Sequence, residues 1–156
     1  VLVRMADRIE ITRDIAASPE AGYDAISDVT RMGEWSEECH ACEWHDGVEP
    51  GAVGAVLTGH NRAGDKEWST QATVVAADRP STFTLDCSTN GFHYATWGYT
   101  IEATDGGSRV TEWTENYIPE EFKAAGAQVS GIADRDGRNR QTMSGTLERL
   151  AAALEA

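Results

Sequence analysis

Residues 39–118 form an almost continuous series of strand-like segments, and this run restricts the possible folds more than any other feature of the sequence. The segments are separated by the kinds of residue that tight hairpin turns require. These turns are marked by Gly, Asp and Asn at positions 64–65, 89–91 and 105–107. Six antiparallel strands are therefore predicted in this region. A seventh is predicted near the N-terminus, where Ile9 and Ile11 alternate with polar residues.

A change of periodicity follows this first strand and predicts two short helices over residues 19–37. Ser18 is suited to cap the first helix, and Pro19 is suited to its first position. Three residues at helical spacing share one face of it: Gly22, Ile26 and Val29.

The C-terminal segment, residues 132–156, is predicted to form one long helix. Its apolar side chains recur at helical spacing in a single stripe: Met143, Leu147, Leu150 and Leu154. One antiparallel sheet would leave a face uncovered, and this stripe can cover it. We therefore predict an α+β fold in which a curved seven-stranded antiparallel sheet wraps around the terminal helix and can enclose a cavity. Residues 119–131 fit either a helix or a loop, and residues 1–156 are expected to form a single domain.

The balance of charge argues against several kinds of partner. The chain carries 26 acidic and 13 basic residues, which gives a net charge of −13. A field of this sign repels phosphate groups, so we expect no binding of nucleic acid and no attachment to anionic lipid. No stretch approaches the ~20 apolar residues that a membrane-spanning helix needs, so no membrane insertion is expected.

The N-terminus and the cysteines predict a cytoplasmic protein. Residues 1–6 are too short for a signal peptide and are expected to lead directly into the first strand. The three cysteines are an odd number, which disfavours a disulfide framework. We expect a monomer or a homodimer that needs no cofactor.

Cys39 and Cys42 are spaced as C-x-x-C, with His40 between them and His45 just beyond. Such a pair can hold a metal or carry out redox chemistry, but this segment lacks the helical pattern of a thioredoxin-type motif. A zinc site needs four converging ligands, whereas residues three apart on a strand point to opposite faces. We therefore expect no metal here, and we interpret these cysteines, like Cys87, as small apolar strand residues.

Several stretches of the sequence resemble one superfamily. They are SPEAGYDAISDVTRMGEWS after the first strand, PGAVGAVLTGHNRAGDKEWSTQATVVAADRPSTFTLD, TWGYTIEATDGGSRVTEW and the terminal MSGTLERL. In order and spacing they are similar to the polyketide cyclase/dehydrase group of the START-like, birch-pollen-allergen-like (SRPBCC) superfamily. The resemblance implies a helix-grip fold, with a mostly apolar cavity between sheet and terminal helix and with the two short helices closing one end. The superfamily has no universal catalytic motif, so no catalytic residue follows from it.

Tryptophan side chains are candidates for the wall of such a cavity, because they are seldom fully buried and the indole N–H needs a partner. The candidates are Trp35, Trp44, Trp68 and Trp97, each equally compatible with ordinary core packing. Strand alternation places His93 and Tyr99 on the same face as Trp97. This face is the more apolar one, so it is expected to point at the terminal helix.

Polar candidates come from three elements. Glu112 lies on the last predicted strand, and alternation does not tell which way it points, although an exposed position is slightly favoured. Asn139 and Arg140 extend the helical stripe beyond Met143 and are candidates to face the cavity, where Arg140 could anchor an anionic ligand group. An ordinary helical salt bridge between Asp136 and Arg140 is the favoured role of Arg140. His60 adds hydrogen-bonding groups whose direction the sequence leaves open.

Three functions remain open from the sequence. The first is binding of a small, largely apolar or aromatic molecule, polyketide- or lipid-like, in the cavity between sheet and helix. The second is a polyketide cyclase or dehydratase with an acid or base in that cavity. The groups available for such chemistry are His60, His93, Tyr99, Glu112 and Arg140. The third is a protein-interaction domain, which predicts a small or filled cavity and an exposed apolar patch.

Overall fold

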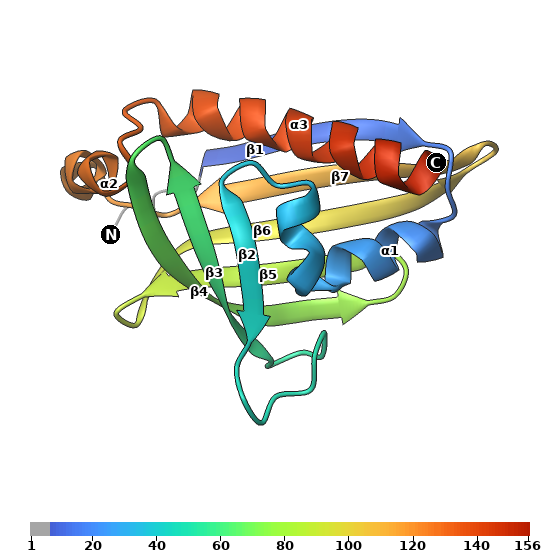
Figure 1. Ribbon diagram of the computed structural model, residues 1–156, viewed down its shortest axis with the longest axis horizontal. Coiled ribbons are helices and arrows are strands. Elements are labelled where there is room, and N and C mark those ends of the chain that lie inside the picture. Colours follow the sequence, from blue (N-terminus) through green and yellow to red (C-terminus); the bar gives the residue numbers. More distant parts are fainter. Residues whose placement is uncertain (1–6) are drawn as a thin grey trace, which may run out of the picture.

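One antiparallel sheet of seven strands dominates the computed structural model, which describes residues 7–156 (Figure 1). The strands are β1 (Asp7–Ile15), β2 (Cys39–Trp44), β3 (Val56–Ala63), β4 (Lys66–Asp78), β5 (Thr82–Thr89), β6 (Phe92–Thr104) and β7 (Gly107–Asn116). Their order in space is β1-β7-β6-β5-β4-β3-β2, so β2 to β7 lie side by side in sequence order and β1 pairs with β7. The predicted seven-stranded sheet is confirmed, whereas the leader expected at residues 1–6 lies outside the described residues.

Two helical segments lie between β1 and β2 in the sequence, and three more follow β7. They are α1 (Pro19–Ser27), the 3-10 helices η1 (Val29–Glu34) and η2 (Glu120–Phe122), α2 (Lys123–Ser130) and α3 (Arg135–Glu155). Ser18 caps α1 as predicted, because its hydroxyl accepts from a backbone N–H of the first turn. The terminal helix begins at Arg135 rather than at residue 132. Asp134 caps it there by accepting from the backbone N–H of Gly137 at 3.0 Å.

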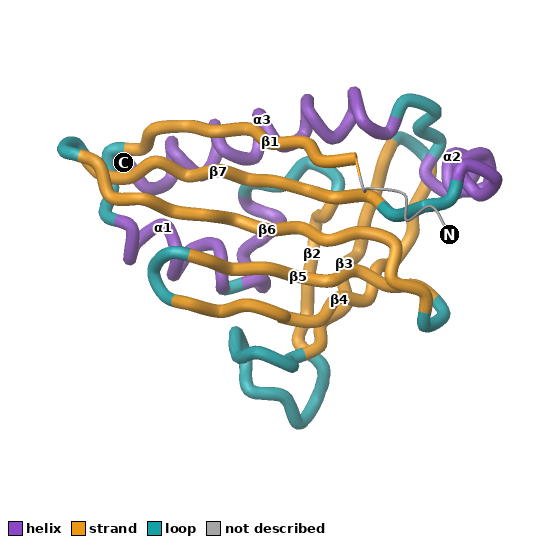
Figure 2. Tube along the Cα trace, turned by 180° about the vertical axis from the view of Figure 1, so that it is seen from behind, coloured by secondary structure: helices purple, strands orange, loops and turns teal. Residues whose placement is uncertain are grey.

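α1 and α3 lie on the same face of the sheet and cover different parts of it (Figure 1). α3 packs along β1 and more lightly on β7, whereas α1 lies over β5, β6 and β7. Strands β2 to β4 run steeply across the other strands and reach toward the N-terminal half of α3, and η1 packs on β2 (Figure 2). We call the face of the sheet that these helices cover the inner face.

The apolar stripe of α3 is buried, as predicted. Met143 and Leu147 are each 1% exposed, Leu150 is 0% exposed, and Leu154 in the last turn is partly covered. Inward-facing side chains of the strands complete this core. Trp97 differs from them, because it remains only partly buried although β6 is a central strand. The inner face is therefore not completely covered around Trp97.

Two of the three irregularities in strand pairing affect candidate residues, and the third lies between β4 and β5 at Val74 and Ala76. In β2 the pairing with β3 shifts between Cys39 and Ala41. Between β5 and β6, Cys87 pairs with Ala95 but the next residue of β5 pairs with His93. A bulge inserts an extra residue into one strand and so interrupts the alternation of its side chains. Simple alternation therefore fails at both places.

Leu150→Ala is expected to lower the free energy of unfolding by about 2–5 kcal/mol, because it leaves a cavity beneath α3. Leu154→Ala, in the partly covered last turn, is expected to cost clearly less. Denaturant titration followed by circular dichroism measures both. A loss below about 0.5 kcal/mol for Leu150→Ala, as at an exposed site, would contradict the role of this stripe as core.

Candidate functional site

Two polar residues lie in the middle of the inner face. Tyr99 of β6 and Glu112 of β7 are directly opposite one another across the two strands. Both are buried, with 9% and 4% of their surface exposed. Alternation places Glu112 on the same face as Val110, which belongs to the core. The exposed position that the sequence slightly favoured for Glu112 is therefore wrong, whereas Tyr99 points inward as predicted.

Burial dominates the electrostatics of this pair. It raises the pKa of Glu112 to about 8, against the opposing effect of a hydrogen bond with Tyr99. Burial and the nearby Glu112 carboxylate hold the pKa of Tyr99 well above its ordinary value. Oε2 of Glu112 is buried, and no group of the described chain bonds to it. Glu112 therefore presents an unused acceptor, or a donor when protonated, inside the protein.

A second cluster of polar side chains lies where α3 begins. Nη1 of Arg135 donates to both carboxylate oxygens of Glu38, at 2.6 and 2.9 Å. It also donates to the side-chain oxygen of Asn139 at 3.3 Å, and the guanidinium lies 5.9 Å from the ring centre of Trp68. Glu38 and Asn139 are both buried. These contacts hold the segment before β2 against the N-terminal end of α3.

A chain of hydrogen bonds crosses the neighbouring strands β3, β4 and β6. Asn61 Nδ2 donates to Thr70 Oγ1 at 3.1 Å, and Thr70 Oγ1 lies 3.1 Å from the hydroxyl of Tyr94. Burial raises the pKa of Tyr94 to about 12, while the positive charge of Arg135 acts in the opposite sense. Tyr94 therefore points inward, toward the beginning of α3.

The bulge in β6 overturns the prediction for His93. Its Nε2 lies 3.0 Å from the carbonyl oxygen of Ala95 and 3.0 Å from Oγ1 of Thr96, and 3.4 Å from Asp86. Thr96 and Asp86 pair across β5 and β6 on the outer face of the sheet. His93 therefore does not reach the inner face, where Tyr94 takes the place expected for it.

Arg140 is also placed differently from the prediction. It is exposed on α3, whereas Asn139 is buried as expected. The apolar stripe indicates only the middle of the buried face of a helix. Which flank becomes covered depends on Glu38, which comes from the segment before β2 and contacts Arg135 and Arg138. Arg140 lies on the uncovered flank.

The remaining apolar candidates occupy different environments. Trp35 is part of the core at 3% exposed, and Met143 is fully covered. Trp44, on the edge strand β2, is half-buried. Trp68 and Trp97 are half-buried as well, and both lie on the inner face. Trp68 and Trp97 therefore combine an inward position with access for a bound molecule.

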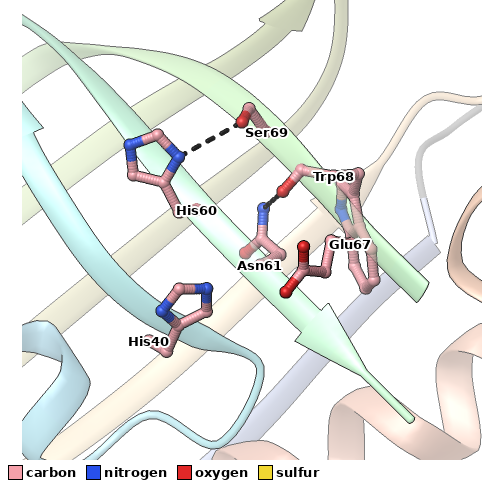
Figure 3. Close-up of a pocket in the computed structure, with 6 residues that line it drawn as sticks. All are labelled: His40, His60, Asn61, Glu67, Trp68 and Ser69. Carbon is pink, nitrogen blue, oxygen red and sulfur yellow. Dashed lines mark hydrogen bonds between the residues drawn. The ribbon is translucent and has the colours of Figure 1, made fainter. Parts of the chain in front are cut away.

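His60 lines an open hollow at the β2–β4 end of the sheet (Figure 3). Its Nδ1 lies 3.3 Å from Oγ of Ser69, and its Nε2 lies 3.1 Å from a carboxylate oxygen of Glu43. The hollow has a volume of about 280 Å³ and is lined by His40, His60, Asn61, Glu67, Trp68 and Ser69. A second hollow, of about 580 Å³, lies beside Trp44. Neither of these two hollows includes a residue of α3.

The bulge in β2 overturns the argument about the cysteines. It turns Cys39 and Cys42 toward one another, with their Sγ atoms 3.2 Å apart, so these side chains do not point to opposite faces. Their mutual hydrogen bond lowers the pKa of Cys39 and raises that of Cys42. Burial raises the pKa of Cys87 to about 12. Within the described part of the chain, no group of three or more His, Cys, Asp or Glu side chains is placed to hold a metal.

Sequence reasoning missed Glu38, Arg135 and Tyr94. Glu38 lies in a connecting segment without periodicity, so no pattern could place it. Tyr94 is the extra residue of a bulge, which alternation cannot reveal. Arg135 offered one usable signal, since it lies four residues before Asn139 and so on the same side of the helix.

Residues 6–155 match the family described as polyketide cyclase / dehydrase and lipid transport. The chain belongs to this family. Membership confirms the superfamily that the sequence resembles, and it supports ligand binding in general. A comparison with curated proteins finds no match. Among the described residues, no helix is both long enough and apolar enough to cross a membrane.

Solved structures of other proteins share the helix-grip fold of this family member. The Polyketide_cyc-like protein Cgl2372 from Corynebacterium glutamicum is 28% identical with a TM-score of 0.58, over 94% of this chain and 88% of that one. The di-domain ARO/CYC StfQ from the steffimycin biosynthetic pathway is 13% identical with a TM-score of 0.73, over 97% of this chain and 51% of that one. The major latex-like protein 151 from Panax ginseng is 14% identical with a TM-score of 0.72, over 97% and 99%.

Glu112→Gln is expected to remove one contribution to the pH dependence of the free energy of unfolding. Because the pKa of Glu112 is raised by folding, its contribution is fully present below about pH 4.5 and is lost as the pH rises toward about 8. Within this window the free energy of unfolding of the wild type should fall relative to the variant by up to about 1.4 kcal/mol per pH unit. Denaturant titrations across the window measure the difference. Glu115→Gln is the control, since its neighbours lower the pKa of Glu115; a constant difference for Glu112→Gln would contradict the burial of a protonated carboxyl.

Arg135→Met is expected to lower the free energy of unfolding by about 1–3 kcal/mol, because it leaves the buried Glu38 without its main partner. Arg140→Met, on the exposed flank of the same helix, should change it by less than about 0.5 kcal/mol. Thermal and denaturant unfolding compare the two variants. Adding Glu38→Gln to Arg135→Met should restore part of the loss, and equal effects of the two arginine variants would contradict the assignment.

Proposed function

We propose that this chain binds a small, largely apolar or aromatic molecule, polyketide- or lipid-like, against the inner face between the sheet and α3. Glu112 is the observation that carries the proposal. It is a buried carboxyl group within an apolar core, and no group of residues 7–156 bonds to its Oε2. Buried polar atoms nearly always have a partner, and a carbonyl or hydroxyl oxygen of a ligand would provide one.

Aromatic side chains around Glu112 would supply the contact area. Trp97 lies two residues before Tyr99 on the same face of β6 and remains half-buried. Flat rings pack well against a flat ligand, and the few polar groups then fix its orientation. Tyr99 holds the Glu112 carboxyl through their hydrogen bond. These groups favour a ligand with a flat apolar body and at least one hydrogen-bonding oxygen.

The cluster of polar side chains at the beginning of α3 would favour a ligand of low charge. Arg135 is already paired with Glu38 at 2.6 Å, so its charge is compensated within the protein. Asn139 and Tyr94 offer neutral hydrogen-bonding groups nearby. We therefore expect a neutral or weakly acidic ligand rather than a strongly anionic one.

A cyclase or dehydratase is the second candidate, and the pKa of Glu112 favours it. A group with a pKa of about 8 can both take and give a proton near neutral pH. The carboxylate of Glu112 would remove a proton from a carbon next to a ligand carbonyl. The resulting acid would return that proton to a hydroxyl group on the adjacent carbon, which leaves as water while a double bond forms. Tyr99, with its pKa well above neutral, would stay protonated and orient the carboxyl.

Fluorescence titration with flat, polyketide-like phenols tests the binding function. Wild type should show saturable quenching of tryptophan emission, and Glu112→Leu should weaken binding roughly 3–10-fold by removing a buried hydrogen bond. Glu115→Leu, on the outer face of β7, is the matched control and should leave the affinity unchanged. If no compound quenches saturably and the interior beneath α3 proves to be filled, the chain is a protein-interaction domain instead.

Mass spectrometry of the same mixtures separates the two candidates. Conversion of a β-hydroxycarbonyl compound with loss of one water, abolished in Glu112→Gln, would establish the enzyme. Saturable binding without any conversion in wild type would establish the binding protein.

A further inference from the structure

Two sulfur atoms lie close to Sγ of Cys42 at the start of β2. Sγ of Cys39 and Sγ of Cys42 are 3.2 Å apart, and Sγ of Cys42 is 4.0 Å from Sδ of Met32 in η1. All three side chains are half-buried. Apolar side chains of similar volume would pack this position as well, so packing alone does not require three sulfur atoms here.

Two glycines make this convergence possible. A Cβ on Gly33 would clash with the carbonyl oxygen of His40, so η1 can bring Met32 up to the bulge of β2 only because this residue is glycine. Gly59 of β3 lies opposite Cys42. A Cβ on Gly59 would come within 3.3 and 3.6 Å of the two cysteine Sγ atoms. The backbone on both sides thus leaves room around the sulfur atoms.

We propose that Cys39, Cys42 and Met32 bind one Cu(I) ion. Two thiolates and a thioether form an all-sulfur donor set, which is the kind that soft Cu(I) prefers. Zinc would need four ligands, and the described residues hold no group of three or more His, Cys, Asp or Glu suited to it. His40 lies between the two cysteines in sequence, but it is exposed and lines the hollow of Figure 3.

The separations of Cys42 Sγ from the other two sulfur atoms suit a three-coordinate site. Metal–sulfur bonds of about 2.3 Å place three sulfur atoms around one ion about 4 Å apart. The separation between Cys42 and Met32 already has this value, at 4.0 Å. The two cysteines would have to open from 3.2 Å by less than about 1 Å, which a small side-chain rotation provides.

The reaction is ligand exchange without any change of oxidation state. Cu(I) forms bonds to both sulfur atoms of Cys39 and Cys42, and the two thiol protons are released to solvent. The complex of one Cu(I) with two thiolates and the neutral thioether carries one negative charge. Because β2 is the edge strand and the sulfur atoms are half-buried, the ion reaches them without unfolding the sheet.

Competition for Cu(I) against a chromophoric chelator, with the reduced full chain and without oxygen, tests the proposal. Wild type should retain one Cu(I) per chain, Cys39→Ser and Cys42→Ser should lose it, and Met32→Leu should weaken it roughly tenfold or more. Two matched controls remove a thiol and a thioether elsewhere in the core: Cys87→Ser and Met143→Leu. Both should keep the wild-type affinity, provided that near-ultraviolet circular dichroism shows a native fold.

X-ray absorption at the copper edge of the wild-type protein adds a test that needs no variant. We expect three sulfur atoms around the copper ion, all at about the same distance from it. Two sulfur neighbours in a linear arrangement, together with unchanged affinity in Met32→Leu, would overturn the three-sulfur site. Loss of copper to the chelator in wild type, or tighter binding of Zn(II) than of Cu(I), would overturn the proposal altogether.

Discussion

Burial of the apolar stripe of α3 against β1 is the interaction on which the rest of the structure depends. Leu147 and Leu150 are completely covered there, and burial of apolar surface is the main force that holds the helix to the sheet. Because α3 packs mainly on β1 and more lightly on β7, the remaining inner face must be covered by other elements. α1 covers part of it, while β2 to β4 bend toward α3 and are joined to it through Glu38 and Arg135. The surface around Trp97 stays partly open as a result.

This arrangement places a carboxyl group where water cannot easily solvate it. Glu112 shares the inner face with core residues, so its charged form loses hydration without gaining an ion pair. A buried ionisable group of this kind lowers stability at neutral pH, and such groups cluster at functional sites. Tyr99 and Trp97 on the adjacent strand provide the hydrogen bond and the aromatic surface that make Glu112 useful to a ligand. The same physical fact, burial, thus links the core to the proposed function.

The bulges in β2 and β6 decide much of the remaining chemistry. In β6 the bulge sends His93 to the outer face and turns Tyr94 inward, which exchanges an imidazole for a phenol at the inner face. In β2 the bulge brings Cys39 and Cys42 together beside η1. Each bulge moves a side chain from one face of the sheet to the other while the order of the strands stays the same.

The sequence by itself determined the seven strands, the short helices after the first strand and the buried stripe of α3, because periodicity and turn residues act locally. It also determined that Tyr99 and Trp97 share a face of one strand, since no bulge separates them. The inward position of Glu112, the outward position of His93 and the exposed position of Arg140 were decided only by the tertiary structure. His93 depends on the strand opposite a bulge, and Arg140 depends on Glu38 against one flank of α3. Glu112 depends on which face of β7 is covered by the core. Local patterns carry no information about such partners, because the free energy that selects them arises only when the separate elements pack together.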